Sequence, residues 1–157
     1  MKEIVIPEGT EKIGNYWFRG SGIERVEIPA SVKEIGVDTF YGCSSLKSVV
    51  FAEDSKLEKI GGGSFYQSGI EKIAIPRGVE EIPRSAFEEC EALEEVALDE
   101  GSRLKTMQNN AFNGCMNLKS IRFPDGLERI GVECFCGSSL EEVILPTSVK
   151  EVGAWAF

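Results

Sequence analysis

The stretch IGVDTFYGCSSL, residues 35–46, decides the fold, because its spacing of glycine, phenylalanine and cysteine returns along the whole 157-residue chain. Seven phenylalanines follow one another at intervals of 22 to 25 residues, and an aliphatic residue or a methionine always stands five positions before them. These are Phe18, Phe40, Phe65, Phe87, Phe112, Phe135 and Phe157. Self-similarity at such a period is typical of a solenoid, in which each unit buries its apolar face against the next unit.

A short strand opens each unit, as in IERVEIP (23–29), IEKIAIP (70–76), LKSIRFP (118–124) and LEEVILP (140–146). Apolar residues at the fourth and sixth positions alternate with polar or mixed ones, which is the period of a half-buried strand. Copies stacked about 4.8 Å apart form a parallel sheet that grows one unit at a time. Proline marks the corner after most strands, whereas Ala52 and Asp99 begin longer corner loops.

The unit L/IxxVxIPxxVxxIGxxAFxxCxxL resembles the BspA-type leucine-rich repeat over all 157 residues. This resemblance implies an α/β repeat solenoid of about seven repeats, a right-handed superhelix with a parallel β-sheet on its concave face. It also implies short helical or irregular segments around each phenylalanine on the convex face. We expect a single solenoid over 1–157, with repeats that start near residues 1, 23, 46, 70, 93, 118 and 140. Its end repeats are incomplete and uncapped, which favours a segment of a longer chain.

The cysteines of this chain indicate packing rather than chemistry. Cys43, Cys90 and Cys115 share one column of the repeat with serines, and Cys134 falls in a column of small residues. Only Cys136 lies in a column that we expect to face water, as a free thiol. The chain has no histidine, which removes the common general base, and no CxxC pair, which disfavours zinc. We therefore expect no catalytic residue, no cofactor and no metal site.

Two acidic corner loops are the remaining candidates for a cation site. One contains Glu53 and Asp54, and the other contains Asp99 and Glu100. Calcium takes about six to eight oxygen ligands, and neither loop follows the spacing of a known calcium loop. We interpret them as solvated turns, with calcium binding as the alternative.

The charge balance narrows the class of partner. The net charge is -9, which disfavours nucleic acid and anionic membrane surfaces as partners. No apolar run is long enough to span a bilayer, so we expect no membrane insertion, and the first residues lack the apolar block of a signal peptide. Many charges fall in two neighbouring columns whose sign mostly alternates from unit to unit, as it does at Lys12, Glu34 and Lys59. Stacking would pair these charges on the surface.

The outward fifth position of the strand is the most suggestive column for binding. On a concave sheet it would align a modest apolar strip with charged margins, to which the third position adds further charges, and such a surface suits a protein partner. The alternative is that β-compatible residues merely fill an open sheet. The predicted protein-binding strip is Glu27, Val50, Lys72, Ala74, Glu95, Ala97, Arg122 and Ile144.

These features predict a non-enzymatic protein–protein interaction domain with adhesin-like binding through the concave face. The alternative is a structural or scaffold subunit of a larger assembly, docked end to end or through its edges. Members of the resembled family are mostly surface or secreted proteins of bacteria and protists that bind other proteins. The resemblance therefore suggests the cell surface or secretion, while the chain itself shows no signal sequence and leaves the compartment open.

Overall fold

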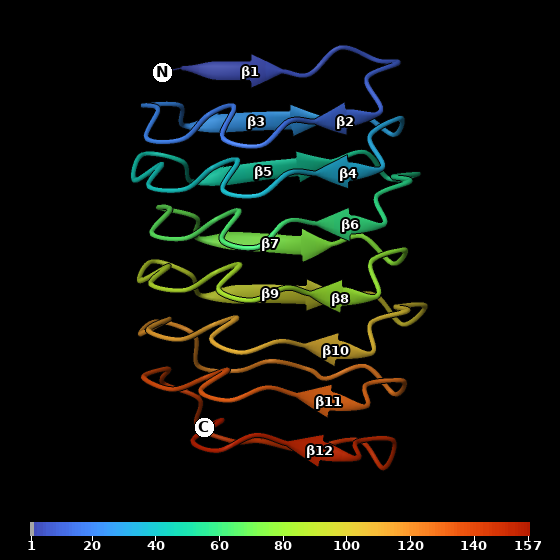
Figure 1. Cartoon of the computed structure of the whole chain (residues 1–157), viewed down its shortest axis with the longest axis vertical. Coiled ribbons are helices and arrows are strands. Elements are labelled where there is room, and N and C mark those ends of the chain that lie inside the picture. The colour runs from blue at the N-terminus through green and yellow to red at the C-terminus, as the bar shows by residue number, and fades with distance from the viewer. Residues whose placement is uncertain (1) are drawn as a thin grey trace.

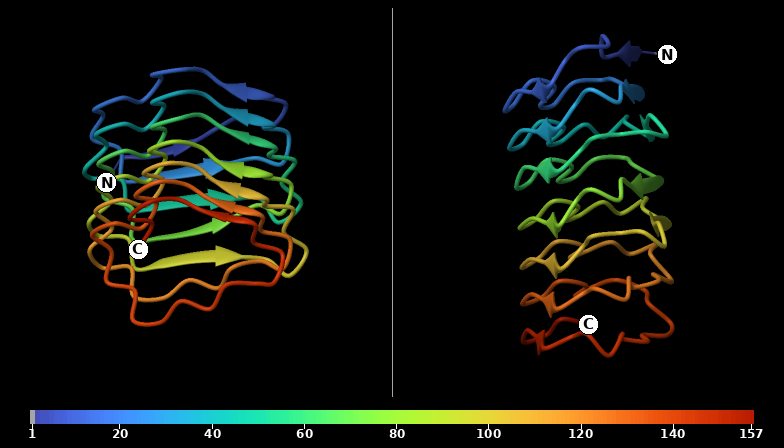
Figure 2. Two further views of the ribbon diagram at one scale, coloured as in Figure 1. Left: turned by 60° about the horizontal axis from the view of Figure 1, so that its bottom comes forward. Right: turned by 90° about the vertical axis from the view of Figure 1, so that its right-hand side faces the viewer.

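A computed structural model describes residues 2–157 as a solenoid of about seven coils built from parallel strands (Figure 1). We number the coils one to seven after the seven repeated phenylalanines that they contain. A strand of three or four residues runs along one side of each of the first five coils, and a strand of two residues runs back along the other side of every coil. The coils stack one on the next, with the two ends of the chain at opposite ends of the stack (Figure 2).

The longer strands form one parallel sheet, the first sheet, in the order β1 (Glu3–Val5), β3 (Arg25–Ile28), β5 (Ser48–Phe51), β7 (Lys72–Ile75) and β9 (Glu95–Leu98). Val26 and Ile28 of β3 are buried while their neighbours are partly exposed, as the alternating pattern predicts. The predicted strands at 118–124 and 140–146 are wrong, since neither segment joins the sheet.

The longer corner loops explain where the first sheet weakens. A longer loop begins at Ala52 directly after β5, and β5 is paired with β7 at the single position Ser48↔Lys72. A second longer loop begins at Asp99 directly after β9, and within residues 2–157 β9 is not paired with any strand of coil six. The extra loop residues thus coincide with the points at which successive coils separate on this face.

The two-residue strands form two further parallel sheets on the other side of the coils. One contains β2 (Lys12–Ile13), β4 (Glu34–Ile35) and β6 (Lys59–Ile60), and the other contains β8 (Glu81–Ile82), β10 (Thr106–Met107), β11 (Arg129–Ile130) and β12 (Glu151–Val152). The break between these two sheets lies at Pro83, which directly follows β8. In other coils the residue that follows the two-residue strand donates its N–H to the preceding coil, as Gly61 does to the Ile35 carbonyl at 2.8 Å. Proline has no N–H to donate, so this bond is lost between coils three and four.

The expectation of an α/β fold is wrong, because residues 2–157 contain no helix. The segments around the phenylalanines, expected to be helical or irregular, are irregular turns. The backbone explains this, since the residue two positions before each repeated phenylalanine has a positive φ, and so does the residue two positions after it where one follows. Three residues between two left-handed ones are too few for a helical turn. The left-handed residues are Tyr16, Asp38, Gly63, Ser85, Asn110, Glu133 and Trp155 before the ring and Gly20, Gly42, Gln67, Glu89, Gly114 and Gly137 after it. No helix that could cross a membrane is found among the described residues.

These turns replace helical hydrogen bonds with bonds between coils, which we call the turn ladder. The N–H groups of Asp38, Phe40 and Gly42 donate to carbonyls of coil three at 3.0, 2.7 and 2.7 Å. The same pattern joins coils three and four, where Phe65 N–H donates to the Ala86 carbonyl at 2.8 Å. The turn ladder therefore continues where the strand pairing is interrupted.

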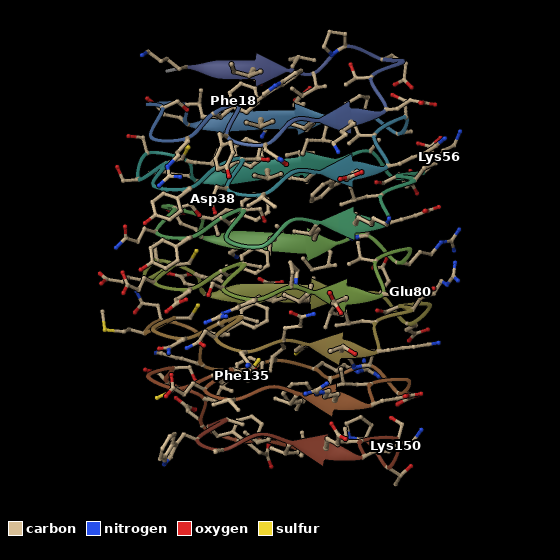
Figure 3. The ribbon with its side chains drawn as sticks, viewed as in Figure 1. Phe18, Asp38, Lys56, Glu80, Phe135 and Lys150 are labelled. Atoms are coloured by element: carbon tan, nitrogen blue, oxygen red, sulfur yellow. The ribbon has the colours of Figure 1, made fainter. Side chains whose placement is uncertain are left out.

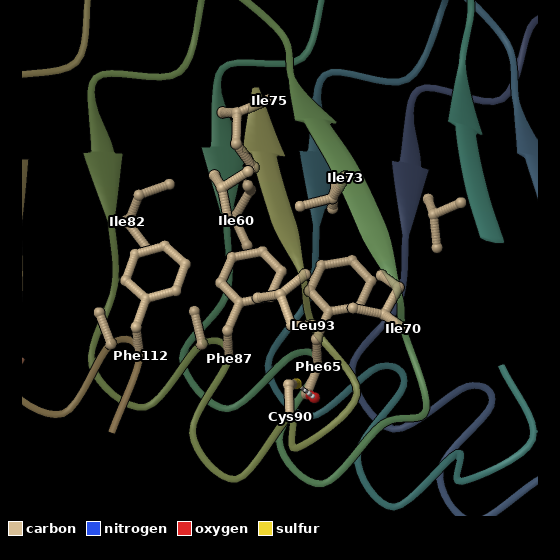
Figure 4. Packing of buried hydrophobic residues seen from close by; sticks show 14 of the residues in the cluster. Ile60, Phe65, Ile70, Ile73, Ile75, Ile82, Phe87, Cys90, Leu93 and Phe112 are labelled. Atoms are coloured by element: carbon tan, nitrogen blue, oxygen red, sulfur yellow. Dashed lines mark hydrogen bonds between the residues drawn. The ribbon is translucent and has the colours of Figure 1, made fainter. Parts of the chain in front are cut away.

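The core of the solenoid is a column of stacked phenylalanine rings (Figure 4). Neighbouring rings are nearly parallel, with centroids 5.1 to 5.6 Å apart. The cysteine column is buried beside it, as predicted, and each thiol also makes a bond that the sequence did not predict. Cys43, Cys90 and Cys115 donate to the carbonyl oxygens of Phe18, Phe65 and Phe87 at 2.9, 2.9 and 3.1 Å. The cysteines thus tie adjacent coils together.

Burial makes most of these thiols unreactive, which gives a first prediction. Desolvation raises the pKa of Cys90 to about 11 and that of Cys134 to about 12, and the thiolate is the nucleophile. At pH 8 we expect a thiol-reactive dye to label Cys136, which is partly exposed, at least tenfold faster than the four buried cysteines. In the Cys136→Ser variant the fast phase should vanish, and all four remaining thiols should react after unfolding. A fast phase that survives this substitution would contradict the assignment.

Candidate functional site

The outward face of the first sheet carries six of the eight residues of the predicted strip. Glu27 and Val50 are register partners on β3 and β5, and Ala74 and Ala97 are partners on β7 and β9. Lys72 and Glu95 are also partners, and their side chains form an ion pair at 3.4 Å. The pairing of the strands therefore aligns Glu27 with Val50 and Ala74 with Ala97, whereas β5 and β7 are paired only at Ser48 and Lys72.

The other two strip residues, Arg122 and Ile144, lie outside the sheet. Both belong to the segments that do not form strands, and Ile144 is 71% exposed. The structure places them beyond β9, in coils six and seven, and does not pair them with the preceding strands. The prediction assumed an unbroken ladder of seven strands, and the sheet has five.

Arg25 organises one margin of this face, and the predicted strip does not include it. Its guanidinium donates to Glu27 Oε1 at 2.8 Å and to Glu3 Oε1 at 3.0 Å. The hydrogen bond to Glu27 raises the pKa of Arg25, although burial opposes this. The carboxylate of Glu27 is therefore already paired within the chain. The sequence signal for this cluster was the third strand position, where Glu3 and Arg25 carry opposite charges in successive coils.

The centre of the face is apolar but small. Val50 is 38% exposed, Ala74 is exposed and Ala97 is half-buried. Paired charges border these residues, since Arg25 binds Glu27 on the neighbouring strand β3, and Lys72 binds Glu95 two positions before Ala74 and Ala97 on β7 and β9. The arrangement offers apolar contact area without a titratable group poised for chemistry.

The opposite side of the coils holds a hollow of about 680 Å³ that crosses the break between β6 and β8. Its walls are the charge columns, which Figure 3 shows among the side chains that project from the stack. The predicted pairing of these charges is confirmed at Lys12–Glu34 (2.9 Å) and Arg129–Glu151 (3.2 Å). Lys59 and Glu81 face each other across the break and form no ion pair within 4.0 Å in the described chain. The hollow itself was missed, because the sequence did not reveal the break.

The acidic corner loops lie around another hollow of about 680 Å³. Glu53, Asp54 and Asp99 line it together with the positively charged residue Arg77. Among residues 2–157 no group of three or more candidate ligands is close enough to hold a metal ion. The loops bring their carboxylates to one corner without forming a coordination site.

Known structures share this architecture. A leucine-rich repeat protein from Bacteroides ovatus is 30% identical with a TM-score of 0.70, over 97% of this chain and 45% of that one. A leucine-rich repeat protein from Eubacterium ventriosum is 21% identical with a TM-score of 0.76, over 96% and 46%. A leucine-rich cell surface protein from Faecalibacterium prausnitzii is 26% identical with a TM-score of 0.60, over 90% and 48%. The chain thus spans about half the length of these proteins.

A family model also matches the chain, and this match identifies its family. No curated protein matches the chain. The family model described as "BspA type Leucine rich repeat region" matches with six copies, over residues 1–94 and 54–157. Because these ranges together cover every residue, the chain belongs to the family of BspA-type leucine-rich repeat proteins.

Proposed function

We propose that this chain is a non-enzymatic protein-interaction segment that binds its partner through the outward face of the first sheet. The observation that carries the proposal is the partly exposed apolar group of Val50, Ala74 and Ala97, which two pairs of opposite charges border. Interfaces between proteins commonly combine an apolar centre with a polar rim.

The charged margins favour specificity over raw affinity. Arg25 and Lys72 are both held by carboxylates of the same face, so a partner meets nearly neutral margins rather than an unpaired charge. Surface ion pairs of this kind are worth about 0–1 kcal/mol each, so a partner can rearrange them at small cost.

The site chemistry also supports the absence of an enzymatic role. The chain has no histidine, and burial raises the pKa values of Cys90 and Cys134, so neither thiol is an activated nucleophile. The abundant carboxylates lie mainly on the outer surface, where many form ion pairs with neighbouring coils.

The test compares two valine-to-glutamate variants matched in exposure. Val50 lies at the centre of the face and is 38% exposed, whereas Val37 follows β4 on the other side of the coil and is 42% exposed. We expect the immobilised Val50→Glu chain to retain at least tenfold less of the proteins captured by the native chain, as measured by quantitative mass spectrometry. A buried charge without a partner at an interface accounts for the loss.

The Val37→Glu variant should retain the same proteins as the native chain. Equal retention by the native and Val50→Glu chains would contradict binding through the first sheet. Loss with Val37→Glu alone would favour the alternative of a scaffold subunit docked through other surfaces. Both variants should unfold at the same denaturant concentration as the native chain, since both side chains are exposed.

A further inference from the structure

The first sheet leaves a segment of backbone without hydrogen bonds. In coil six, the N–H and C=O groups of residues 120–123 have no backbone partner in the described part of the chain. The last bonds before this segment are those of Leu118 and Lys119, whose carbonyl oxygens accept from Ser139 N–H at 3.2 Å and Glu141 N–H at 3.1 Å. Coils six and seven are therefore joined at residue 119 and separate beyond it.

A hollow of about 510 Å³ lies where these two coils separate. The bond between Lys119 and Glu141 bounds it at one end, and the two coils meet again beyond the corners at Pro124 and Pro146, where Ser148 Oγ donates to the Leu127 carbonyl at 2.6 Å. We call this hollow the wedge. Ile121, Phe123, Ile144 and Leu145 give the wedge apolar walls, and Arg122 and Glu142 lie on its two sides.

The ladder of the earlier coils shows where the free backbone groups point. Ile6 N–H donates to the Glu27 carbonyl at 3.0 Å, so the fifth-position carbonyl points to the preceding coil. Ala52 N–H donates to the Ile28 carbonyl at 3.1 Å, so the sixth-position carbonyl points to the following coil. By this alternation, the backbone of Phe123 points at coil seven and that of Ile144 points at coil six. Both sets of groups face into the wedge.

We propose that this wedge binds an extended polypeptide segment of a partner protein, which adds as a strand between residues 120–123 and 142–145. An extended backbone offers both donors and acceptors along its edges, which is what unpaired N–H and C=O groups of a strand-like segment require. This inference rests on the proposed function, because it assumes that the partner is a protein bound on the side of the coils that carries the first sheet. It adds that the part of the partner recognised there is an extended segment.

The walls of the wedge define the sequence of that segment. Strand residues alternate between the two faces, so every second side chain of the occupant points toward Ile121 and Phe123 and is apolar. The intervening side chains face solvent beside Arg122 and Glu142, which carry opposite charges, so the occupant has little net charge. A strand of this protein, such as IEKIAI at residues 70–75, has this pattern and serves as the probe.

The first measurement is amide hydrogen exchange in the free chain. We expect the amides of Ile121 and Phe123 to exchange at least tenfold faster than those of Ile73 and Ile75 in β7, which lie in the sheet. Equal protection of the two pairs would show that coil six is already bonded, and this would overturn the proposal.

The second measurement adds the capped hexapeptide IEKIAI at millimolar concentration. Exchange at Ile121 and Phe123 should slow at least tenfold, and the same peptide with every backbone nitrogen methylated should have no effect, because it keeps the side chains and loses the donors. No slowing with the unmethylated peptide, or equal slowing with both peptides, would overturn strand addition.

Two substitutions at one exposed position locate the site. Ile144→Pro removes an N–H that faces the wedge, whereas Ile144→Ala shortens the side chain and keeps it. We expect the proline variant to weaken peptide binding at least tenfold and the alanine variant to weaken it less than threefold. Equal affinities would contradict backbone recognition. Val50→Glu should leave peptide binding unchanged. The peptide test at the wedge can therefore fail while binding through the first sheet is supported, and binding through the first sheet can fail while the peptide test succeeds.

Discussion

Replacing Phe87 with alanine is expected to lower the free energy of unfolding by about 3–5 kcal/mol. The ring of Phe87 is fully buried and stacks between Phe65 and Phe112, with centroids 5.1 and 5.2 Å away. Its removal leaves a cavity between two rings that the turn ladder holds in place, since Phe87 N–H itself donates to the Ala111 carbonyl at 2.8 Å. The surrounding coils cannot close the gap without breaking that ladder. Urea denaturation followed by circular dichroism measures the change.

The same substitution at the end of the column is the matched control. Among the described residues Phe157 stacks on one ring, Phe135 at 5.6 Å, meets Phe123 edge to face at 6.5 Å, and is 48% exposed. We expect Phe157→Ala to cost less than half as much as Phe87→Ala. Equal losses would show that stability is not carried by the interior of the ring column. A repeat protein in which neighbouring coils contribute separately should show this gradient from interior to end.

The ring and cysteine columns could be predicted from the sequence because they depend only on periodicity. Phe40 and Cys43 have equivalents at the same offset in other units, so stacking in register buries those of the interior coils. The stacked charges follow for the same reason where the coils stay in register, as at Lys12 and Glu34. Contacts between equivalent positions need no knowledge of the turns.

The form of the turns could not be predicted in this way. A left-handed conformation is ordinary for Gly63 or Asn110, but the same column holds Glu133 and Trp155, which rarely adopt it. The column therefore carries no common residue type that would signal the turn. The contacts between coils impose the conformation, and the helical alternative was equally compatible with the spacing.

The interruptions of the sheets were visible in the sequence but could not be interpreted. Pro83 and the longer loops at Ala52 and Asp99 stand out as departures from the repeat. Their consequence depends on which backbone groups pair between coils, which spacing alone does not specify. For this reason the predicted strip extended to Arg122 and Ile144, while the sheet stops at β9.

Gly61→Ala is expected to cost about 3 kcal/mol, although it adds a single methyl group. A Cβ at this position would lie 2.3 Å from the Gly36 carbonyl carbon and 2.4 Å from Val37 N, both of them backbone atoms of coil two. Coils two and three would have to move apart, which stretches the bond from Gly61 N–H to the Ile35 carbonyl, now 2.8 Å. Overpacking that displaces backbone typically costs about 1–3 kcal/mol, and here neither coil can yield alone because both continue into further stacked coils.

Gly101→Ala makes the same chemical change where space is open. The nearest atom to a Cβ there is Arg77 Cδ, the middle of a flexible side chain, at 3.8 Å, and the residue lies in an exposed corner loop. We expect its free energy of unfolding to stay within about 0.5 kcal/mol of the native value. Denaturation curves of the two variants with equal slopes and separated midpoints would place the cost in the close approach of coils two and three. Coinciding midpoints would mean that the coils can separate at this point without loss, and the close packing of glycine backbones would then contribute nothing to holding the solenoid together.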